Sequence, residues 1–436
     1  MKVHLRMTGC RLNQSELEQM ARQFEQQGHE ITTQADEADW MVVNTCAVTQ
    51  QATASSRKLI RELHRANADA QITVTGCYAQ IAPDEITVLP GVTRIIDNIG
   101  KDSLVEELTG QPAEAFDFEP VSRTTREGRT RAFVKVQDGC DNACTFCITT
   151  VARGQGRSRA LDEIIAEIRY LHTLGYQEAV LTGVHLGSYG HDLGDRHGLS
   201  RLVQTILDET DIPRVRLSSL EPWDLDEDFF SLWYNPRLCR HLHLPLQSGS
   251  DQTLRRMARH TNQANFRALV AAARDAAPEM CITTDVIVGF PGETDAEFEQ
   301  SAAFIEEMAF AGLHVFPYSR RTGTPAARMK HHVRDEIKKQ RSARLLELSK
   351  TLEARYAQQF VGQTRDVLWE HIAGASEDGF INVGYTDNYI RVRCIHPRVL
   401  TNAMTPAELL HYDTGMQQMH VQPYIDLIDI HSIHEG

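Results

Sequence analysis

Gly139-Cys140-Asp141-Asn142-Ala143-Cys144-Thr145-Phe146-Cys147 carries three cysteines at the spacing C-x3-C-x2-C. An iron–sulfur cubane is normally held by four thiolates, and no fourth cysteine lies near this stretch. A cubane held by three thiolates leaves one iron open, as a catalytic metal site leaves a position for water or substrate. A zinc site and a chance group of buried thiols are the alternatives. Zinc usually takes two paired Cys or His arms, and the sequence has no second such arm, so we predict a cluster.

The spacing of Cys140, Cys144 and Cys147 resembles the signature of radical S-adenosylmethionine enzymes. In those enzymes the open iron chelates the amino and carboxylate groups of S-adenosylmethionine. The resemblance therefore implies a cofactor site beside this loop, which is followed by the basic run Arg153-Gly154-Gln155-Gly156-Arg157-Ser158-Arg159.

Length and composition place the chain among globular proteins. Its 436 residues predict two to four domains, and 42% hydrophobic with 24% charged residues is ordinary for such chains. No apolar run approaches the length of a membrane span, and the first residues lack the layout of a signal peptide, so we expect no membrane partner. Nine cysteines without paired secretory spacing indicate a reducing cytoplasm. The net charge of −14 argues against a nucleic-acid partner unless basic groups gather locally.

Residues 1–110 alternate strand and helix, which predicts a parallel sheet with right-handed crossovers. Helices are expected over 15–27 and 52–66, where apolar residues recur on one face. The expected strands are 3–7, 40–43 and 72–74, and each is followed by a cysteine: Cys10, Cys46 and Cys77.

These three cysteines share one topological position, because open parallel sheets bind ligands at the carboxyl edge of their strands. We expect Cys10, Cys46 and Cys77 to converge there and to hold a second iron–sulfur cluster with three protein thiolates. The alternative is that each thiol is a small apolar residue, which is a common role for buried free cysteine.

Residues 111–131 lack periodicity and contain Pro112 and Pro120, so 116–131 are expected to form a linker. The linker ends in four arginines, which would be either solvated or turned toward phosphates: Arg123, Arg126, Arg129 and Arg131.

From residue 132 the strand–helix alternation resumes, and six strands are expected: 133–136, 179–181, 215–217, 242–244, 284–288 and 314–316. Small and polar residues follow their carboxyl ends, as the active site of a barrel requires. A partial (β/α)6 barrel is the simplest fold, and the loop of Cys140, Cys144 and Cys147 would lie at its mouth.

A long helix is expected over 335–360, after which the pattern changes to β. Strands over 366–371, 380–394 and 419–433 predict a small barrel. Within 380–394, alternation places Tyr389, Arg391 and Arg393 on one face, a surface suited to stacking bases and meeting phosphates. Alternation between core and solvent would produce a similar pattern.

Several motifs together resemble the radical methylthiotransferase family, and the resemblance covers essentially the whole chain. They are Gly9-Cys10-Arg11-Leu12-Asn13-Gln14, Asn44-Thr45-Cys46-Ala47-Val48-Thr49, Gly76-Cys77-Tyr78-Ala79-Gln80, the 139–147 loop with Ala152-Arg153-Gly154, and Leu244-Pro245-Leu246-Gln247-Ser248-Gly249-Ser250. The stretch Gly384-Tyr385-Thr386-Asp387-Asn388-Tyr389 resembles the RNA-binding TRAM module. Many family members have proline where this chain has Thr150, which changes the loop but removes no ligand.

The resemblance implies an α/β chain of three units joined by the linker. They are an N-terminal methylthiotransferase domain with an auxiliary cluster (1–115), a central radical S-adenosylmethionine barrel (132–360) and a TRAM-like RNA-binding β-barrel (361–434). The motifs lean toward the branch that acts on N6-threonylcarbamoyladenosine at position 37 of tRNA. Sister branches act on isopentenyladenosine in tRNA or on an aspartate of a ribosomal protein.

By the same resemblance, Cys140, Cys144 and Cys147 hold the 4Fe–4S cluster that cleaves S-adenosylmethionine, and the resulting radical takes hydrogen from carbon-2 of the adenine. The second triplet, Cys10, Cys46 and Cys77, holds the 4Fe–4S cluster that carries the sulfur. An aryl C–H bond has no acidic proton for a general base, so chemistry supplied by a cofactor is required. Further cofactor contacts are expected from residues at the barrel mouth, although each could simply cap a strand end: Phe146, Glu221, Gln247 and Asp285.

The implied partners are tRNA and an electron donor such as flavodoxin or ferredoxin, and no feature of the sequence identifies the sulfur donor. The rival interpretation from another class is a non-catalytic RNA-binding iron–sulfur scaffold or redox sensor.

Overall fold

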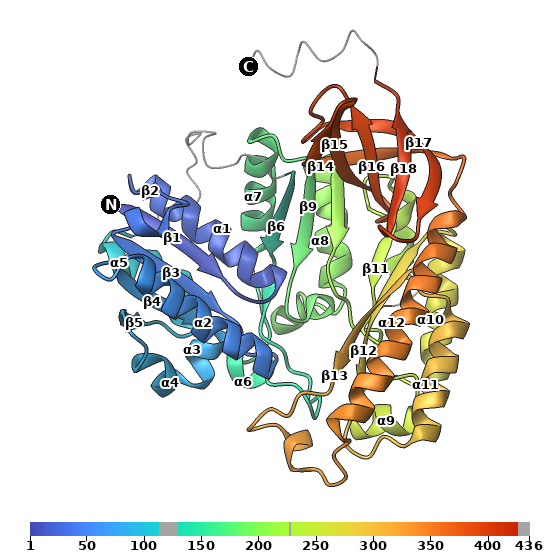
Figure 1. Cartoon of the computed structure of the whole chain (residues 1–436), viewed down its shortest axis with the longest axis horizontal. Coiled ribbons are helices and arrows are strands. Elements are labelled where there is room, and N and C mark those ends of the chain that lie inside the picture. The colour runs from blue at the N-terminus through green and yellow to red at the C-terminus, as the bar shows by residue number, and fades with distance from the viewer. Residues whose placement is uncertain (113–129, 226–227, 426–436) are drawn as a thin grey trace.

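The computed structural model describes residues 1–112, 130–225 and 228–425 and shows three α/β and β units (Figure 1). The first unit is a parallel sheet of order β2-β1-β3-β4-β5. Its strands are β1 (Lys2–Met7), β2 (Glu30–Ile31), β3 (Trp40–Thr45), β4 (Gln71–Gly76) and β5 (Val92–Ile95). Its helices are α1 (Arg11–Gln26), α2 (Gln50–Ala66), α3 (Cys77–Ile81), α4 (Pro83–Thr87) and α5 (Leu104–Thr109), with short 3-10 turns at Ala35–Glu37 and Gly100–Ser103. The predicted parallel sheet is confirmed.

Helix α1 begins at Arg11, four residues before the start predicted from apolar periodicity. Its first turns bury the polar residues Asn13 and Glu16, whose side chains are bonded to other segments of the chain. Periodicity counts only apolar residues, so it misses a helical face that is buried through polar partners.

The middle unit contains the six predicted strands: β6 (Arg131–Lys135), β9 (Glu178–Thr182), β10 (Arg214–Leu217), β11 (His241–His243), β12 (Cys281–Val288) and β13 (Gly312–Pro317). They form two parallel sheets, β10-β9-β6 and β11-β12-β13. Parallel bridges from Val215 to Leu238 and from Ser219 to His243 join the sheets into one open arc. The predicted partial barrel is therefore confirmed, with its opening between β6 and β13.

Helices cover the outside of the arc and bury one large apolar core against it (Figure 1). They are α7 (Leu161–Thr173), α8 (Gly198–Glu209), α10 (Gln263–Ala276), α11 (Asp295–Met308) and α12 (Asp335–Gln358). Two shorter helices contribute no residue to this core: α6 (Thr149–Arg153), which contacts α3, and α9 (Asp251–Arg256). Short 3-10 turns lie at Leu186–Ser188, His191–Leu193, Asp228–Tyr234 and Pro325–Arg328. Linker residues 116–129, with three of the four arginines, lie outside the described residues, whereas Arg131 opens β6. No helix of the described part is long and apolar enough to cross a membrane.

The third unit is a closed barrel of order β14-β15-β16-β18-β17, which confirms the predicted small β-barrel. Its strands are β14 (Thr364–Ser376), β15 (Gly379–Thr386), β16 (Arg391–His396), β17 (Met404–Asp413) and β18 (Gln418–Pro423). The strand predicted over 380–394 is two strands with a turn between them, because Thr386 Oγ1 donates to Asn388 and Tyr389 adopts φ +63°. The part of the last predicted strand beyond residue 425 lies outside the described residues.

Arginines dock this barrel onto the amino ends of the open barrel's strands. Arg214 donates to the backbone oxygens of Tyr385 (3.2 Å) and Asp366 (2.6 Å), and Arg216 donates to that of Asp387 (3.1 Å). Glu178 on β9 accepts from Arg216 Nε at 2.6 Å and holds its guanidinium in place. Because the closed barrel covers the amino ends, the carboxyl ends of the strands lie on the side away from it (Figure 1).

The Glu178–Arg216 pair predicts a pH dependence of stability. Burial alone would raise the pKa of Glu178, but Arg216 lowers it from 4.5 to about 2. A lowered folded-state pKa stabilises the fold above pH 4.5, and that contribution, about 3 kcal/mol, is lost as the pH falls toward 2. Glu178→Gln apoprotein should therefore be less stable than wild type at pH 7, with the difference shrinking below pH 4.5 in urea unfolding. The exposed control Glu106→Gln should show no such convergence, and a constant Glu178→Gln deficit would contradict the assignment.

Candidate functional site

The first cysteine triplet lies on a loop between β7 (Gln137–Asp138) and α6. A two-stranded hairpin of β7 with β8 (Arg157–Ser158) closes the base of the loop, and Cys140 N–H donates to Gly154 O at 3.0 Å. Gly139 has φ +73°, and a Cβ there would lie 1.8 Å from Gln155 O. Only glycine fits that position, so the backbone itself fixes where the three thiols begin.

Burial raises the pKa of the Cys144 thiol to about 11 and also raises that of Cys147. Against burial, Arg259 lowers the pKa of Cys144, and Thr149 N–H donates to Cys147 Sγ at 3.4 Å. Asn142 N–H likewise donates to Cys140 Sγ at 3.4 Å. Metal binding requires thiolates, and cations and N–H groups directed at sulfur stabilise that charged form.

Polar side chains surround this triplet on the barrel side. Arg259 donates to Glu221 at 3.0 Å, approaches Cys144 Sγ to 3.7 Å and lies over the ring of Trp223 at 4.5 Å. Arg259 Nε and the hydroxyl of Ser218 are buried with no hydrogen-bond partner in the described part of the chain. Unsatisfied buried polar groups are costly, so this rim has donors left over for a polar cofactor.

A histidine–aspartate pair lies beside Cys140. His185 Nε2 is 2.6 Å from Asp224 Oδ2, and both side chains are almost fully buried. Burial lowers the pKa of His185, but the hydrogen bonds to Asp224 and Cys140 outweigh it and raise that pKa to about 10. Sequence reasoning missed His185, Asp224 and Arg259, because each follows a different strand and no spacing links them to the cysteines.

The second triplet lies at the carboxyl ends of adjacent strands, as predicted. Cys10 follows β1, Cys46 follows β3 and Cys77 opens α3 after β4, and these strands pair in the register Met7↔Asn44 and Thr45↔Gly76. Asn13 ties the strand ends together, because its Nδ2 donates to Thr8 O (2.8 Å) and Thr45 O (3.2 Å). Cys10 Sγ lies 3.7 Å from Asn13 Oδ1.

The three thiols of this triplet lie within electrostatic range of one another. Burial raises the pKa of Cys46 to about 11, and Cys10 and Cys77 raise it further, whereas the N–H of Val48 lowers it. Yet within the described residues no three Cys, His, Asp or Glu side chains are placed to share one metal ion. The thiolates of a cubane bind different irons and need not converge on one point. The donor set of each triplet thus fits a three-thiolate cluster.

A buried polar network joins the two triplets. Arg153, at the end of α6, donates to Glu16 (2.8 Å), Asp138 (2.9 Å) and Asn13 (2.8 Å). Asn98 Nδ2 donates to Ala152 O at 2.6 Å and lies 3.9 Å from Cys77 Sγ. The loop of the first triplet is therefore held directly against the strand edge that carries the second.

The predicted cofactor contacts occupy different environments. Glu221 pairs with Arg259 near Cys144, while Phe146 packs edge-to-face on Phe290 with centroids 6.4 Å apart. Gln247 adopts φ +68° and its N–H donates to Asp285 O at 2.8 Å. The Asp285 carboxylate lies 3.2 Å from His243 Nε2. Glu221 thus lies at the first triplet, and Asp285 faces the neighbouring strand within the arc.

The predicted RNA-facing residues are divided between two places. Arg391 and Arg393 lie on β16, and Arg391 is exposed, whereas Tyr389 lies on the turn before the strand. Tyr389 stacks on Tyr385 (centroids 4.9 Å) and lies 4.5 Å from the His241 ring, so it packs against the open barrel. Alternation failed here because the positive φ of Tyr389 breaks the strand. Tyr389 and Arg391 also line a crevice of about 310 Å³ between β12, β13, α12 and the closed barrel.

Comparison with known proteins identifies both α/β units. Residues 2–96 match the family described as "Uncharacterized protein family UPF0004", and residues 134–305 match the Radical SAM superfamily. The chain is 39% identical over 397 residues to "Threonylcarbamoyladenosine tRNA methylthiotransferase MtaB" of Bacillus subtilis, with 88% of each chain covered. It is 34% identical to "tRNA-2-methylthio-N(6)-dimethylallyladenosine synthase" of Oceanobacillus iheyensis, with 95% of this chain and 82% of that protein covered.

Among solved structures, the chain resembles the radical S-adenosylmethionine methyltransferase TsrM of Kitasatospora setae. The TM-score is 0.55 at 16% identity, with 74% of this chain and 76% of that chain covered. At this identity the likeness concerns the fold.

The two separate triplets predict two independent clusters. Anaerobically reconstituted protein should hold about eight irons, and the triple Ala variant of Cys10, Cys46 and Cys77 should hold about four. The control replaces three cysteines outside both triplets, the buried Cys239, Cys281 and Cys394, and should keep about eight. Iron and sulfide analysis with Mössbauer spectroscopy measures the change. A triple variant with full iron content would show that the second cluster is misplaced.

Proposed function

Because this chain belongs to the radical S-adenosylmethionine methylthiotransferase family, we propose that it adds a methylthio group to carbon-2 of N6-threonylcarbamoyladenosine at position 37 of tRNA. The observation that carries the proposal is the pair of cysteine triplets on facing edges, joined by Arg153. The choice of nucleoside is supported by the higher identity to the threonylcarbamoyladenosine enzyme, 39% against 34% for the dimethylallyladenosine enzyme.

In this proposal Cys140, Cys144 and Cys147 hold the cluster that binds S-adenosylmethionine, and Cys10, Cys46 and Cys77 hold the sulfur-carrying cluster. When bound, the two clusters and S-adenosylmethionine would supply radical abstraction of an unactivated hydrogen and the delivery of sulfur. Side chains alone cannot perform this chemistry. The chain supplies position: Arg153 fixes the two loops against each other, and Arg259 and Glu221 form the rim of the cofactor site. Arg259 is an additional candidate for binding the cofactor carboxylate, since its Nε is buried and unsatisfied among the described residues.

The remaining assignments divide the work among the units. The N-terminal unit (1–115) carries the auxiliary cluster, the central unit (132–360) carries the radical chemistry, and the TRAM-like barrel (361–434) binds tRNA. Exposed Arg391 on the closed barrel supports the last assignment. We further propose cytoplasmic localisation and an electron donor of the flavodoxin or ferredoxin type, since cleavage of S-adenosylmethionine consumes an electron.

Single cysteine variants test the division between the two sites. Cys144→Ala should lose deoxyadenosine formation and all methylthiolated product, because two thiolates rarely retain a cubane. Cys46→Ala should still form deoxyadenosine but should make no methylthiolated product. Chromatography of deoxyadenosine and mass spectrometry of digested tRNA measure both outcomes.

Three results would count against the proposal. Loss of deoxyadenosine in Cys46→Ala with the first cluster's iron retained would show that the sites are not separable. Full methylthiolation by Cys46→Ala would reduce the second triplet to structural thiols. A wild-type protein that binds both clusters and tRNA but never cleaves S-adenosylmethionine would instead be the non-catalytic scaffold.

The closed barrel should contribute part of the phosphate contacts. Replacing Arg391 and Arg393 with Gln removes two cations and should lower the slope of log K against log salt by about 1.5. Binding of tRNA should weaken correspondingly, while iron content stays unchanged. The outward-facing pair Arg169 and Arg201 provides the control, since both lie on exposed helical surface. An unchanged slope in the Arg391/Arg393 variant would move the phosphate contacts to another surface.

A further inference from the structure

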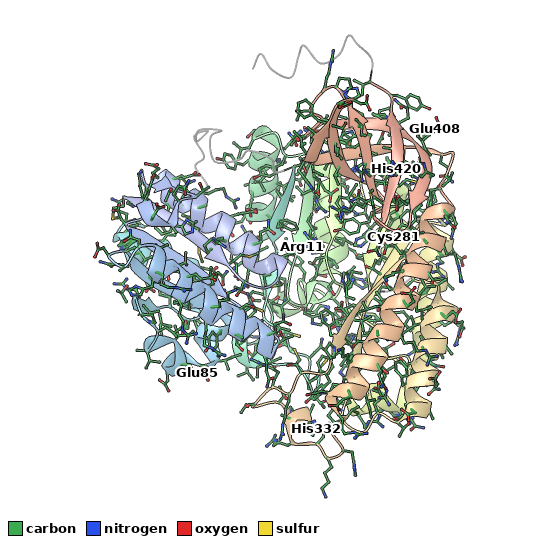
Figure 2. All side chains as sticks on the ribbon, in the orientation of Figure 1. Arg11, Glu85, Cys281, His332, Glu408 and His420 are labelled. Atoms are coloured by element: carbon green, nitrogen blue, oxygen red, sulfur yellow. The ribbon has the colours of Figure 1, made fainter. Side chains whose placement is uncertain are left out.

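Arg11 lies where the three units meet. It follows Cys10 directly and opens α1, and its side chain is exposed. The guanidinium lies 4.9 Å above the ring of Phe133 on β6, and its Nη2 donates to the hydroxyl of Tyr389 at 3.3 Å. Figure 2 shows Arg11 near the centre of the molecule, between the N-terminal layer and the open barrel. One side chain thus reaches from the second cysteine triplet to the TRAM-like barrel.

The charge of Arg11 is not neutralised by the protein. Other arginines at this junction are each paired with a carboxylate: Arg131 with Glu370, Arg153 with Glu16, Arg216 with Glu178 and Arg259 with Glu221. Arg11 forms no ion pair within the described residues, and its one hydrogen-bond partner is a neutral phenol. Its long bond to Tyr389 is weaker than the charge-assisted bond that a carboxylate would make.

Histidine side chains of the open arc lie within electrostatic range of Arg11. Burial lowers the pKa values of His241 and His314, and the charge of Arg11 contributes to both effects. The nearby carboxylate of Asp285 lies 3.2 Å from His243 and does not contact Arg11. The His243 and His314 rings lie 5.3 Å apart.

The nucleoside of the proposed function carries such an anion. Its threonylcarbamoyl group ends in a carboxylate, whereas adenosine and dimethylallyladenosine are uncharged at this position. A carboxylate taken out of water requires a cationic partner with good geometry, and a guanidinium can bind both of its oxygens.

We propose that Arg11 binds the carboxylate of the threonylcarbamoyl group and thereby selects this nucleoside over uncharged adenosines. The inference rests on the proposed function and adds the side chain that recognises the modified nucleoside. Because Arg11 is adjacent to Cys10, the same contact holds the modified base beside the sulfur-carrying site. Tyr389 is the positioning residue that holds the guanidinium before the nucleoside enters.

Binding to short RNAs tests this role without turnover. The probes are anticodon stem-loops that carry either N6-threonylcarbamoyladenosine or plain adenosine at position 37, measured against the reconstituted protein. For Arg11→Gln, affinity for the modified RNA should fall about 10- to 100-fold, while affinity for the plain RNA stays unchanged. Arg11→Lys should restore part of the preference, because it keeps the charge but not the two-oxygen contact.

Arg169→Gln is the matched control, an exposed arginine on the outer surface of the open barrel, and should bind both RNAs as wild type does. Iron content should be equal in all variants. Equal weakening toward both RNAs would make Arg11 a phosphate or structural contact, and no weakening toward either would remove it from recognition. Both results overturn the inference.

Assays of the wild-type protein distinguish a failure of this inference from a failure of the proposed function. If wild type methylthiolates the threonylcarbamoyl RNA and Arg11→Gln keeps the full preference, only the role of Arg11 fails. If wild type neither prefers nor modifies that RNA, the proposed function fails, and the role of Arg11 fails with it.

Discussion

The ion pairs and hydrogen bonds of the buried Arg153 guanidinium fix how the N-terminal unit sits against the open barrel. The partners of Arg153 come from two units, Glu16 and Asn13 on α1 and Asp138 at the base of the cysteine loop. A second cation, Lys101, pairs with Glu16 at 2.8 Å. Buried charges are tolerated only when paired and hydrogen-bonded, so these residues force the N-terminal sheet and the open barrel into one relative position. That position brings the two cysteine triplets to facing edges.

The cost of burying charge also explains why the pKa values of the buried thiols are raised. Burial raises the pKa of the Cys46 and Cys144 thiols to about 11. Iron binding must displace the thiol protons, and the backbone N–H groups and Arg259 around the sulfurs reduce that cost. Arg11 is exposed and forms no ion pair with a carboxylate of the described chain, so its charge remains available to an anion.

The closed barrel completes this arrangement from the opposite end. Arg214 and Arg216 bind its backbone oxygens rather than its side chains, which fixes its orientation against the open barrel, and Arg391 on β16 is exposed. Tyr389 belongs to that contact, and it places an aromatic ring between the closed barrel and the interior of the arc. The closed barrel, proposed to bind tRNA, and the N-terminal unit, proposed to carry sulfur, are therefore in contact through Tyr389 and Arg11.

The sequence by itself determined the two cysteine triplets, the parallel order of the first sheet, the six strands of the open barrel and the terminal β module. Strand and helix periods are local, and parallel strands bring Cys10, Cys46 and Cys77 to one edge whatever the side chains do elsewhere. Tertiary structure alone decided the early start of α1, the place of Tyr389 and the partners of Arg153, Arg259 and Arg11. These depend on which polar groups find partners from distant segments. Local patterning carries no information about such pairs, because their energy comes from desolvation and geometry in the folded chain.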